Sequence, residues 1–174
     1  NLYGLTKDFN FLKNLYINKK LPKVLMLTGK KGSGKATLIN HLMFFIFDQK
    51  NYDDKINKLK KNTNFYNQFS NNMFENIIYL SGSDFKNIKV EDIRNLKKKI
   101  YQTSISNKSR FIILDDVELF NHNSLNALLK SIEEPTKNNY FLLINNKTKP
   151  VLNTIKSRSL EIKIILNKKE TDQI

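Results

Sequence analysis

The sequence predicts an α/β fold in which a five-stranded parallel sheet is covered by helices on both faces. Three observations support this prediction. Short apolar runs alternate with helical patterns along the chain, a glycine-rich loop follows the first apolar run, and 174 residues are enough to bury one core. Because we find neither an internal repeat nor a clear domain boundary, we treat residues 1–174 as one domain.

The predicted strands are short, continuous apolar runs, which is how parallel strands buried on both faces read in a sequence. They cover residues 24–27, 77–80, 111–114, 140–144 and 160–166. The first run ends at the glycine-rich loop, and the third continues directly into two aspartates. Both features therefore lie where a strand of the predicted sheet ends.

Helices are predicted between these strands. Residues 38–47 are strongly apolar and should pack against the sheet, whereas residues 90–100 alternate apolar and charged side chains at helical spacing. Residues 125–132 follow the same spacing until Pro135 ends the pattern. Pro150 suits the first position of a short helix that reaches residue 155.

The composition is strongly basic, since 30 Lys and Arg residues against 16 Asp and Glu give a net charge of +14. The positive charge comes from 27 Lys and 3 Arg, and the chain also has 25 Asn. A solvated, lysine-rich surface explains this excess at least as well as a patch for nucleic acid. Each arginine is informative, because its planar guanidinium offers paired donors that lysine lacks. The three are Arg94, Arg110 and Arg158.

Several classes of protein are disfavoured. The chain has no cysteine, which excludes a disulfide framework, a thiolate nucleophile and a cysteine-type zinc site. His41 and His122 lie far apart in sequence, so we expect no metal at either. The apolar runs are too short to span a bilayer and the first residues show no signal-peptide pattern, so we expect a cytoplasmic protein without a membrane partner.

A phosphate-binding loop is predicted after the first strand and at the start of a helix, the position that such a loop requires. Glycines allow positive φ and close backbone approach, so that successive N–H groups surround phosphate oxygens. Lys35 would reach the β and γ phosphates of a nucleotide. The predicted nucleotide-binding residues are Gly29, Gly32, Ser33, Gly34, Lys35, Ala36 and Thr37.

The loop departs from the usual pattern at the residue after its lysine. A Ser or Thr hydroxyl at that position binds Mg²⁺, but this chain has Ala36 there. Thr37 is a poor substitute, because it is displaced by about 100° around the helix. We therefore expect ATP and Mg²⁺ to bind weakly.

Two carboxylates follow the third predicted strand. Asp115 stands where a P-loop protein places the carboxylate that orients magnesium. Asp116 follows it, at the position where efficient ATPases commonly have a glutamate that activates water. Its side chain is one methylene shorter than glutamate, so we expect poor hydrolysis of any nucleotide bound by this chain.

The sequence resembles a known family in three segments: the glycine-rich loop, residues 126–135 and Ser157-Arg158-Ser159. Residues 126–135 read Asn-Ala-Leu-Leu-Lys-Ser-Ile-Glu-Glu-Pro and are the most specific of the three. Two glutamates at a helix C-terminus oppose the helix dipole without evident compensation, which also suggests an origin in function or in evolutionary history. The segments are similar to the AAA+ module of bacterial DNA polymerase III clamp-loader subunits, most closely the delta-prime type.

This resemblance implies roles for further residues. In the family a Ser-Arg-Cys motif supplies an arginine finger to ATP bound by the neighbouring subunit. Arg158 matches that arginine, although Ser159 replaces the cysteine. Asn145 falls at the family's sensor position after the fourth strand, where a polar side chain faces the γ phosphate, and the adjacent Asn146 is an alternative.

The resemblance also implies what this chain lacks. Clamp-loader subunits often carry a four-cysteine zinc module after the phosphate-loop helix, and a chain without cysteine cannot form one. Residues 49–75 would occupy that place, and their scattered aromatic residues favour an ordered insertion over a free linker. The lid and collar domains of the family do not appear in residues 1–174, so we read the chain as the N-terminal module alone.

Three functions are compatible with these residues. We favour a delta-prime-like subunit that hydrolyses little ATP itself, with gamma/tau and delta subunits as partners and the sliding clamp and primer-template DNA as indirect ones. An active gamma/tau-like or other P-loop ATPase is disfavoured by Ala36 and Asp116. A small-molecule kinase built on the same loop would have no need for residues 126–135 or Arg158.

Overall fold

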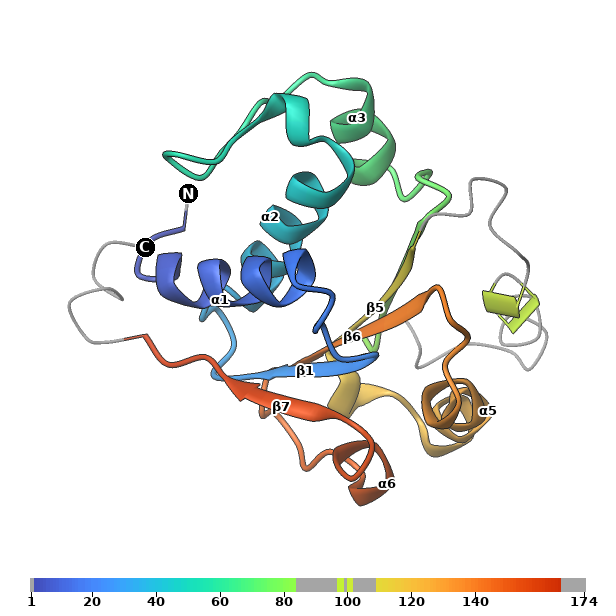
Figure 1. The fold of residues 1–174 in the computed structure, drawn as a ribbon. Helices are drawn as coiled ribbons and strands as arrows, with labels where there is room; N and C mark the ends of the chain where they lie inside the picture. Colours follow the sequence, from blue (N-terminus) through green and yellow to red (C-terminus); the bar gives the residue numbers. More distant parts are fainter. Residues whose placement is uncertain (1, 84–96, 99, 102–108, 167–174) are drawn as a thin grey trace. The chain divides into compact units, whose positions relative to one another are not determined.

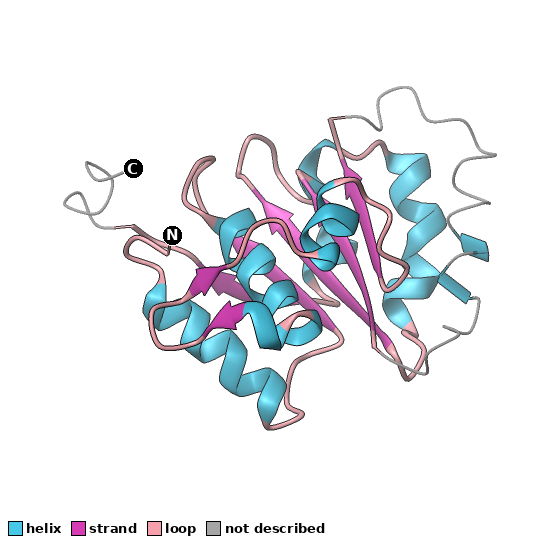
Figure 2. Cartoon of the chain, turned by 90° about the horizontal axis from the view of Figure 1, so that it is seen from above, coloured by secondary structure: helices cyan, strands magenta, loops and turns pink. Residues whose placement is uncertain are grey.

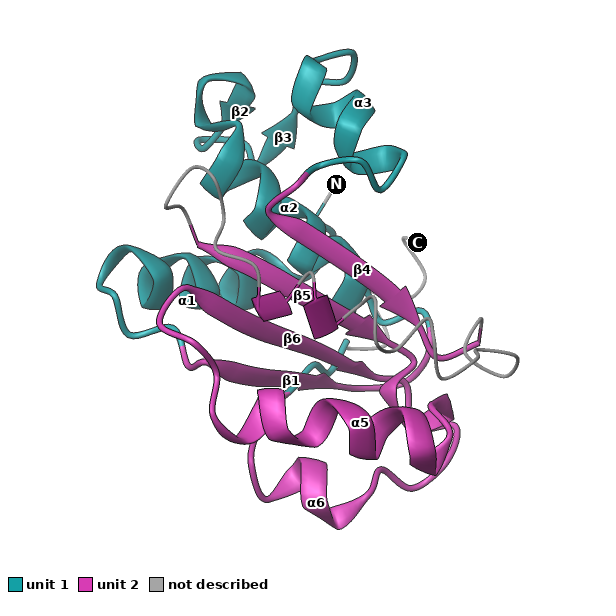
Figure 3. Ribbon diagram, turned by 90° about the vertical axis from the view of Figure 1, so that its right-hand side faces the viewer, with its two compact units in different colours: residues 1–21, 32–74, 163–174 teal, residues 22–31, 75–162 magenta. Residues whose placement is uncertain are grey.

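The computed structural model of the chain describes residues 2–83, 97–98, 100–101 and 109–166. The chain divides into two compact units, coloured separately in Figure 3. Unit 1 contains residues 1–21, 32–74 and 163–174, and unit 2 contains residues 22–31 and 75–162.

A five-stranded sheet forms the centre of unit 2, with the strand order β4-β5-β6-β1-β7. Its strands are β1 (Val24–Thr28), β4 (Ile77–Ser81), β5 (Arg110–Asp115), β6 (Asn139–Asn145) and β7 (Leu160–Lys163). Figure 1 labels β1, β5, β6 and β7, and Figure 2 draws the strands in magenta. β4 pairs in parallel with β5, β5 with β6, and β6 with β1. These findings confirm the predicted α/β class and parallel sheet.

The central strands form where the sequence is continuously apolar. β1 is buried along its whole length, β6 is buried except for the half-buried Tyr140, and β5 is buried up to its last residue. Their registers place the carboxyl ends of neighbouring strands side by side. Thr28 lies opposite Asn145, and Ser81 lies opposite Asp115. Polar residues therefore gather at one edge of an apolar sheet, where ligands bind in open α/β sheets.

Helices α5 (His122–Glu133) and α6 (Asn153–Lys156) pack against one face of this sheet (Figure 3). Alternate residues of the strands meet apolar residues of the helices in one buried cluster, which includes Met26, Ile112, Phe141, Leu128, Ile132 and Ile155. Burying one such side chain contributes about 1.5–3 kcal/mol, so this packing stabilises α5 more than its caps do. The Asn121 side chain caps α5 by accepting a bond from the Ser124 N–H at 2.7 Å.

Unit 1 contains helix α1 (Thr6–Ile17) packed on helix α2 (Lys35–Phe47). The predicted apolar helix 38–47 is confirmed, and it begins three residues earlier, at the phosphate-binding loop. Helix α1 was not predicted from the sequence. Its signal is the helical spacing of Leu5, Phe9 and Leu12, which are all buried.

The segment 49–75 is an ordered insertion, as its aromatic residues predict. It contains the 3-10 turn η1 (Gln49–Asn51), the hairpin strands β2 (Tyr52–Asp53) and β3 (Lys58–Leu59), and helix α3 (Asn64–Ser70). Phe65 of α3 packs edge-on against Phe44 of α2, with ring centroids 4.8 Å apart. Phe74 packs in the same way against Phe47, at 4.9 Å.

Two predicted boundaries are wrong. The helix expected at Pro150 begins only at Asn153, because Val151 is buried in the core and Leu152 keeps an extended backbone. Strand β7 ends at Lys163, three residues before the predicted boundary. Most of the predicted helix 90–100, together with Arg94, lies outside the described residues. Within the described ranges, no helix is long and apolar enough to cross a membrane.

Candidate functional site

The predicted phosphate-binding loop leaves β1 and leads directly into α2. The N–H of Gly29 donates to the carbonyl oxygen of Asn145 at 3.1 Å, which joins the start of the loop to the end of β6 in unit 2. Gly32 and Gly34 have φ values of 82° and 77°. Both lie in the left-handed region, where a side chain is strained, so these positions favour glycine.

Lys35 is the first residue of α2, and its side chain is buried within unit 1. Its Nζ donates to Ser33 Oγ at 3.1 Å, which holds the ammonium group beside the loop. No acidic residue occupies the first turn of α2, so the positive end of the helix dipole is not neutralised there. The glycine-rich loop, the Lys35 ammonium group and the start of α2 together offer the positive charge and N–H donors that bind phosphate.

The residues that would bind magnesium in this loop are less suited to it. Ala36 is exposed and offers no side-chain oxygen, and Thr37 is half-buried on a different side of the helix. The donor set of the loop therefore fits phosphate oxygens but not a metal ion. Across the described residues, no group of three or more histidine, aspartate, glutamate or cysteine side chains is placed to hold a metal.

Asp115 and Asp116 lie together at the carboxyl end of β5, as predicted, and both already accept hydrogen bonds. Asp115 Oδ2 accepts from the Tyr79 hydroxyl at 2.5 Å, and its Oδ1 accepts from the Asp116 N–H at 2.8 Å. Asp116 is buried with a φ of 49°, a conformation that aspartate tolerates better than most residues. Its Oδ1 accepts from the Asn146 side-chain amide at 2.6 Å.

The two candidate sensor residues have different partners. Asn145 is buried at the end of β6, where its Oδ1 accepts from the Lys147 N–H at 2.9 Å and its amide points to Thr28 Oγ1 at 3.5 Å. Asn146 is half-buried and bonds to Asp116. Asn145 thus shapes the turn that follows β6, and Asn146 joins that turn to the end of β5.

Glu118 is a site residue that the sequence analysis missed. It lies in the 3-10 turn η3 (Val117–Leu119), and its side chain is buried. Its Oε1 accepts from the N–H groups of Asn146 and Thr148 at 3.0 and 3.2 Å and from the Thr148 hydroxyl at 2.9 Å. Glu118 and Asp116 together connect the turn after β5 with the turn after β6.

Arg158 lies just after α6 on the surface of unit 2, with 35% of its side chain exposed. Its Nη2 pairs with Glu133 Oε1 at 2.7 Å, and its Nη1 donates to the Thr154 carbonyl at 2.8 Å and to Ser157 Oγ at 3.1 Å. The expectation that the glutamates ending α5 lack compensation is therefore wrong for Glu133, since Arg158 offsets its charge. Arg110, by contrast, is buried in unit 2.

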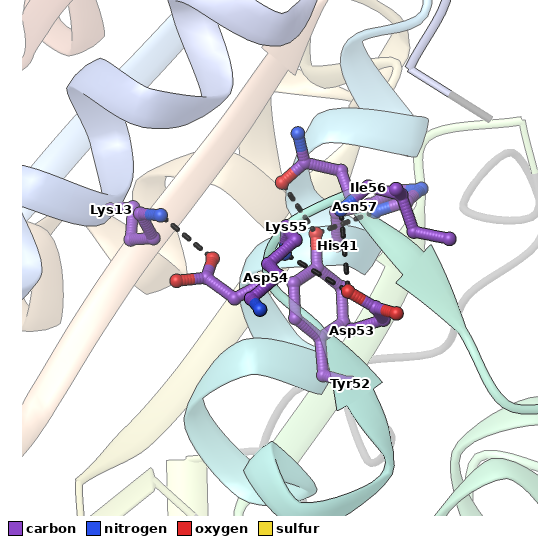
Figure 4. A network of polar contacts seen from close by, with 8 residues as sticks. All are labelled: Lys13, His41, Tyr52, Asp53, Asp54, Lys55, Ile56 and Asn57. Carbon is purple, nitrogen blue, oxygen red and sulfur yellow. Dashed lines mark hydrogen bonds and ion pairs between the residues drawn. The ribbon is translucent and has the colours of Figure 1, made fainter.

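Each of the two histidines contacts a polar side chain. His41 is buried in unit 1, where its Nδ1 lies 3.0 Å from the Tyr52 hydroxyl of the hairpin (Figure 4). Burial lowers the pKa of His41 to about 4, so the ring is neutral at pH 7. Lys13 of α1 pairs with Asp54 at 2.7 Å on the same hairpin. His122, at the start of α5, lies 2.7 Å from the Asn126 side-chain amide.

Comparison with known proteins identifies related sequences and folds. The family model described as "DNA polymerase III, delta subunit" matches residues 4–167. The DNA polymerase III subunit delta′ of Buchnera aphidicola subsp. Baizongia pistaciae is 28% identical over 149 residues, covering 83% of this chain and 44% of the relative. The gamma subunit of Buchnera aphidicola subsp. Schizaphis graminum is 36% identical over 76 residues, 44% of this chain and 21% of that subunit.

The fold is also found in a solved structure. The crystal structure of a gamma-subunit-related DNA polymerase III protein from Thermotoga maritima aligns with a TM-score of 0.63 at 19% identity, covering 92% of this chain and 48% of that protein. Such a low identity shows a common fold alone. The chain spans less than half the length of the Buchnera delta′ relative and of this structure.

Proposed function

This chain belongs to the DNA polymerase III delta-subunit family and is a clamp-loader subunit of the delta-prime type, and from that premise we propose that it hydrolyses little ATP itself and provides Arg158 to ATP bound by a neighbouring subunit. Its partners would be gamma/tau and delta subunits, and through them the sliding clamp and primer-template DNA. The observation that carries the proposal is the surface position of Arg158, held by three contacts from its own unit.

The chemistry of Arg158 supports this role. A guanidinium can contact two phosphate oxygens at once, and an arginine supplied in trans neutralises the charge that develops during phosphoryl transfer. Contacts from Thr154 and Ser157 fix one nitrogen of the group, which limits the entropy lost when a phosphate binds. Of the two arginines that the structure describes, Arg158 is the one at the surface.

Weak hydrolysis at this chain's own loop is supported by the residues that would hold magnesium and water. Lys35 and the start of α2 suit the phosphates of a nucleotide, and magnesium would supply charge neutralisation between them. However, Ala36 gives the metal no ligand. Asp115 and Asp116 already accept hydrogen bonds from Tyr79 and Asn146, which would have to be exchanged before either carboxylate could orient a metal or a water molecule.

An active, gamma-like ATPase is the second candidate, because the chain shares 36% identity over 76 residues with a gamma subunit and retains Lys35. ATP turnover by this chain alone separates the two candidates. Our proposal predicts turnover close to the uncatalysed rate, and a rate like that of an active AAA+ motor would support the gamma-like alternative instead.

The proposal is tested by reconstituting the clamp loader with variants of this chain. We expect Arg158→Ala to lower ATP turnover at the neighbouring site by on the order of a thousandfold, the range typical of arginine fingers. Arg158→Lys should recover little, because lysine cannot make a bidentate contact. Lys156→Ala is the matched control, since it removes an exposed positive charge two residues away. Equal turnover in the wild type and Arg158→Ala would refute the proposal.

A further inference from the structure

We propose that the carboxylate of Glu133 occupies, in the unassembled subunit, the place on Arg158 that a phosphate oxygen takes on assembly. This inference rests on the proposed function of Arg158. Glu133 thereby keeps the guanidinium in position and neutralises it until a stronger anion replaces the carboxylate.

The contacts of Arg158 divide between its two terminal nitrogens. Nη1 is bound by the Thr154 carbonyl and Ser157 Oγ, both within the arginine's own turn. Nη2 is bound by Glu133 Oε1 at 2.7 Å, from the end of α5, 25 residues earlier in the chain. A phosphate can therefore replace Glu133 at Nη2 while the local contacts keep Nη1 in place.

The position of Glu133 explains why it is exchanged easily. A carboxylate at a helix C-terminus is repelled by the negative end of the helix dipole, so the helix end itself does not hold Glu133 in place. The two side chains are 41% and 35% exposed, and ion pairs at such exposed sites are weak. A phosphate carries more negative charge and offers several acceptor oxygens, so it competes well for the same donor.

Glu134 provides a matched control. It follows Glu133 at the same helix end, is exposed, and forms no ion pair within the part of the chain that the structure describes. Glu134→Gln therefore removes the same charge beside the same dipole without changing the partner of Arg158. In Glu133→Gln the side chain can still accept a hydrogen bond from Arg158, but it has no negative charge to repel an incoming phosphate.

The first experiment uses this chain alone and measures how fast phenylglyoxal modifies Arg158, by mass spectrometry of the peptide that contains it. We expect Glu133→Gln to raise the modification rate by a few-fold, up to about fivefold. This is the largest factor that the free energy of an exposed ion pair can produce. Glu134→Gln should leave the modification rate unchanged. Equal rates in the wild type and Glu133→Gln would overturn the inference.

The second experiment measures ATP turnover of the reconstituted clamp loader as a function of ATP concentration. We expect Glu133→Gln to lower the half-saturating ATP concentration by up to about fivefold with little change in maximal rate. A lower maximal rate with unchanged half-saturation would contradict the inference and make Glu133 a structural support. If Arg158→Ala leaves turnover unchanged, the proposed function itself fails. If it lowers turnover but Glu133→Gln matches the wild type, only the present inference fails.

Discussion

Replacing Glu118 by alanine tests whether this buried carboxylate holds the turn that carries the candidate sensor residues. One oxygen of Glu118 accepts three hydrogen bonds, from the N–H groups of Asn146 and Thr148 and from the Thr148 hydroxyl. Between these residues, Lys147 has a φ of 57°, a left-handed conformation that lysine adopts at a cost. Without the carboxylate, three donors lose their acceptor and the strained turn loses its anchor.

The magnitude follows from these contacts. A hydrogen bond to a charged group contributes about 1.5–3 kcal/mol, but three donors share one oxygen here, and water can reach the exposed residues 147 and 148. The other oxygen, Oε2, is buried and has no hydrogen-bond partner among the described residues, so its removal also relieves a desolvation cost. We therefore expect Glu118→Ala to lower the free energy of unfolding by about 2–3 kcal/mol, well below the sum of three bonds.

Urea unfolding followed by circular dichroism measures this change, with Glu161→Ala, an exposed glutamate of β7, as the control. Glu118→Gln keeps an acceptor without its charge, so it should cost only about 1 kcal/mol. Hydrogen exchange gives a local readout, because the amides of Asn146 and Thr148 should exchange faster in Glu118→Ala. A loss below about 0.5 kcal/mol, the range of an ordinary surface substitution, would show that Glu118 does not hold this turn.

Four further variants test other parts of the structure. Gly82→Ala should lower the free energy of unfolding by about 1–3 kcal/mol in a thermal or urea melt, because its Cβ would collide with the Asp116 carbonyl; Gly32→Ala, which has open space but positive φ, should lose about 1–2 kcal/mol. The pKa of His41 is about 4 in the fold and 6.5 in the unfolded chain. Between pH 6.5 and 4 the unfolded chain therefore binds a proton that the folded chain does not, so the free energy of unfolding should fall as the pH drops through that window. The difference in unfolding free energy between the wild type and His41→Phe at pH 7 and pH 5 measures that contribution, and a pH-independent difference would contradict it. Ala36→Thr should raise magnesium-dependent nucleotide affinity in a fluorescence titration, whereas unchanged affinity would show that the missing hydroxyl is not limiting.

The strands could be predicted from the sequence because their signal is local. Phe111 to Leu114 and Tyr140 to Ile144 are continuous apolar runs, and a sheet covered by helices is where such runs are stable. The phosphate-binding loop could be predicted for the same reason, since the positive φ of Gly32 and Gly34 restricts the residue type directly. Helix α1 carried only a weak pattern, because Phe9 and Leu12 are the only buried residues between Thr6 and Ile17.

Partners distant in sequence could not be predicted. Glu118 reads as an exposed acidic residue, and its burial depends on donors 28 and 30 residues later that the fold brings to the same edge of the sheet. Glu133 reads as an unfavourable charge at a helix end until the fold places Arg158 beside it. Pro150 is a good helix start by local rules, but the core position of Val151 keeps the chain extended past it.

We propose that this chain acts on a neighbour's nucleotide and not on its own. ATP turnover of the reconstituted clamp loader, measured side by side for Lys35→Met and Arg158→Ala, tests it most directly. Lys35→Met removes the ammonium group of this chain's own loop, and Arg158→Ala removes the proposed finger. We predict turnover near wild type for Lys35→Met and a large loss for Arg158→Ala. A large loss for Lys35→Met with wild-type turnover for Arg158→Ala would contradict this proposal.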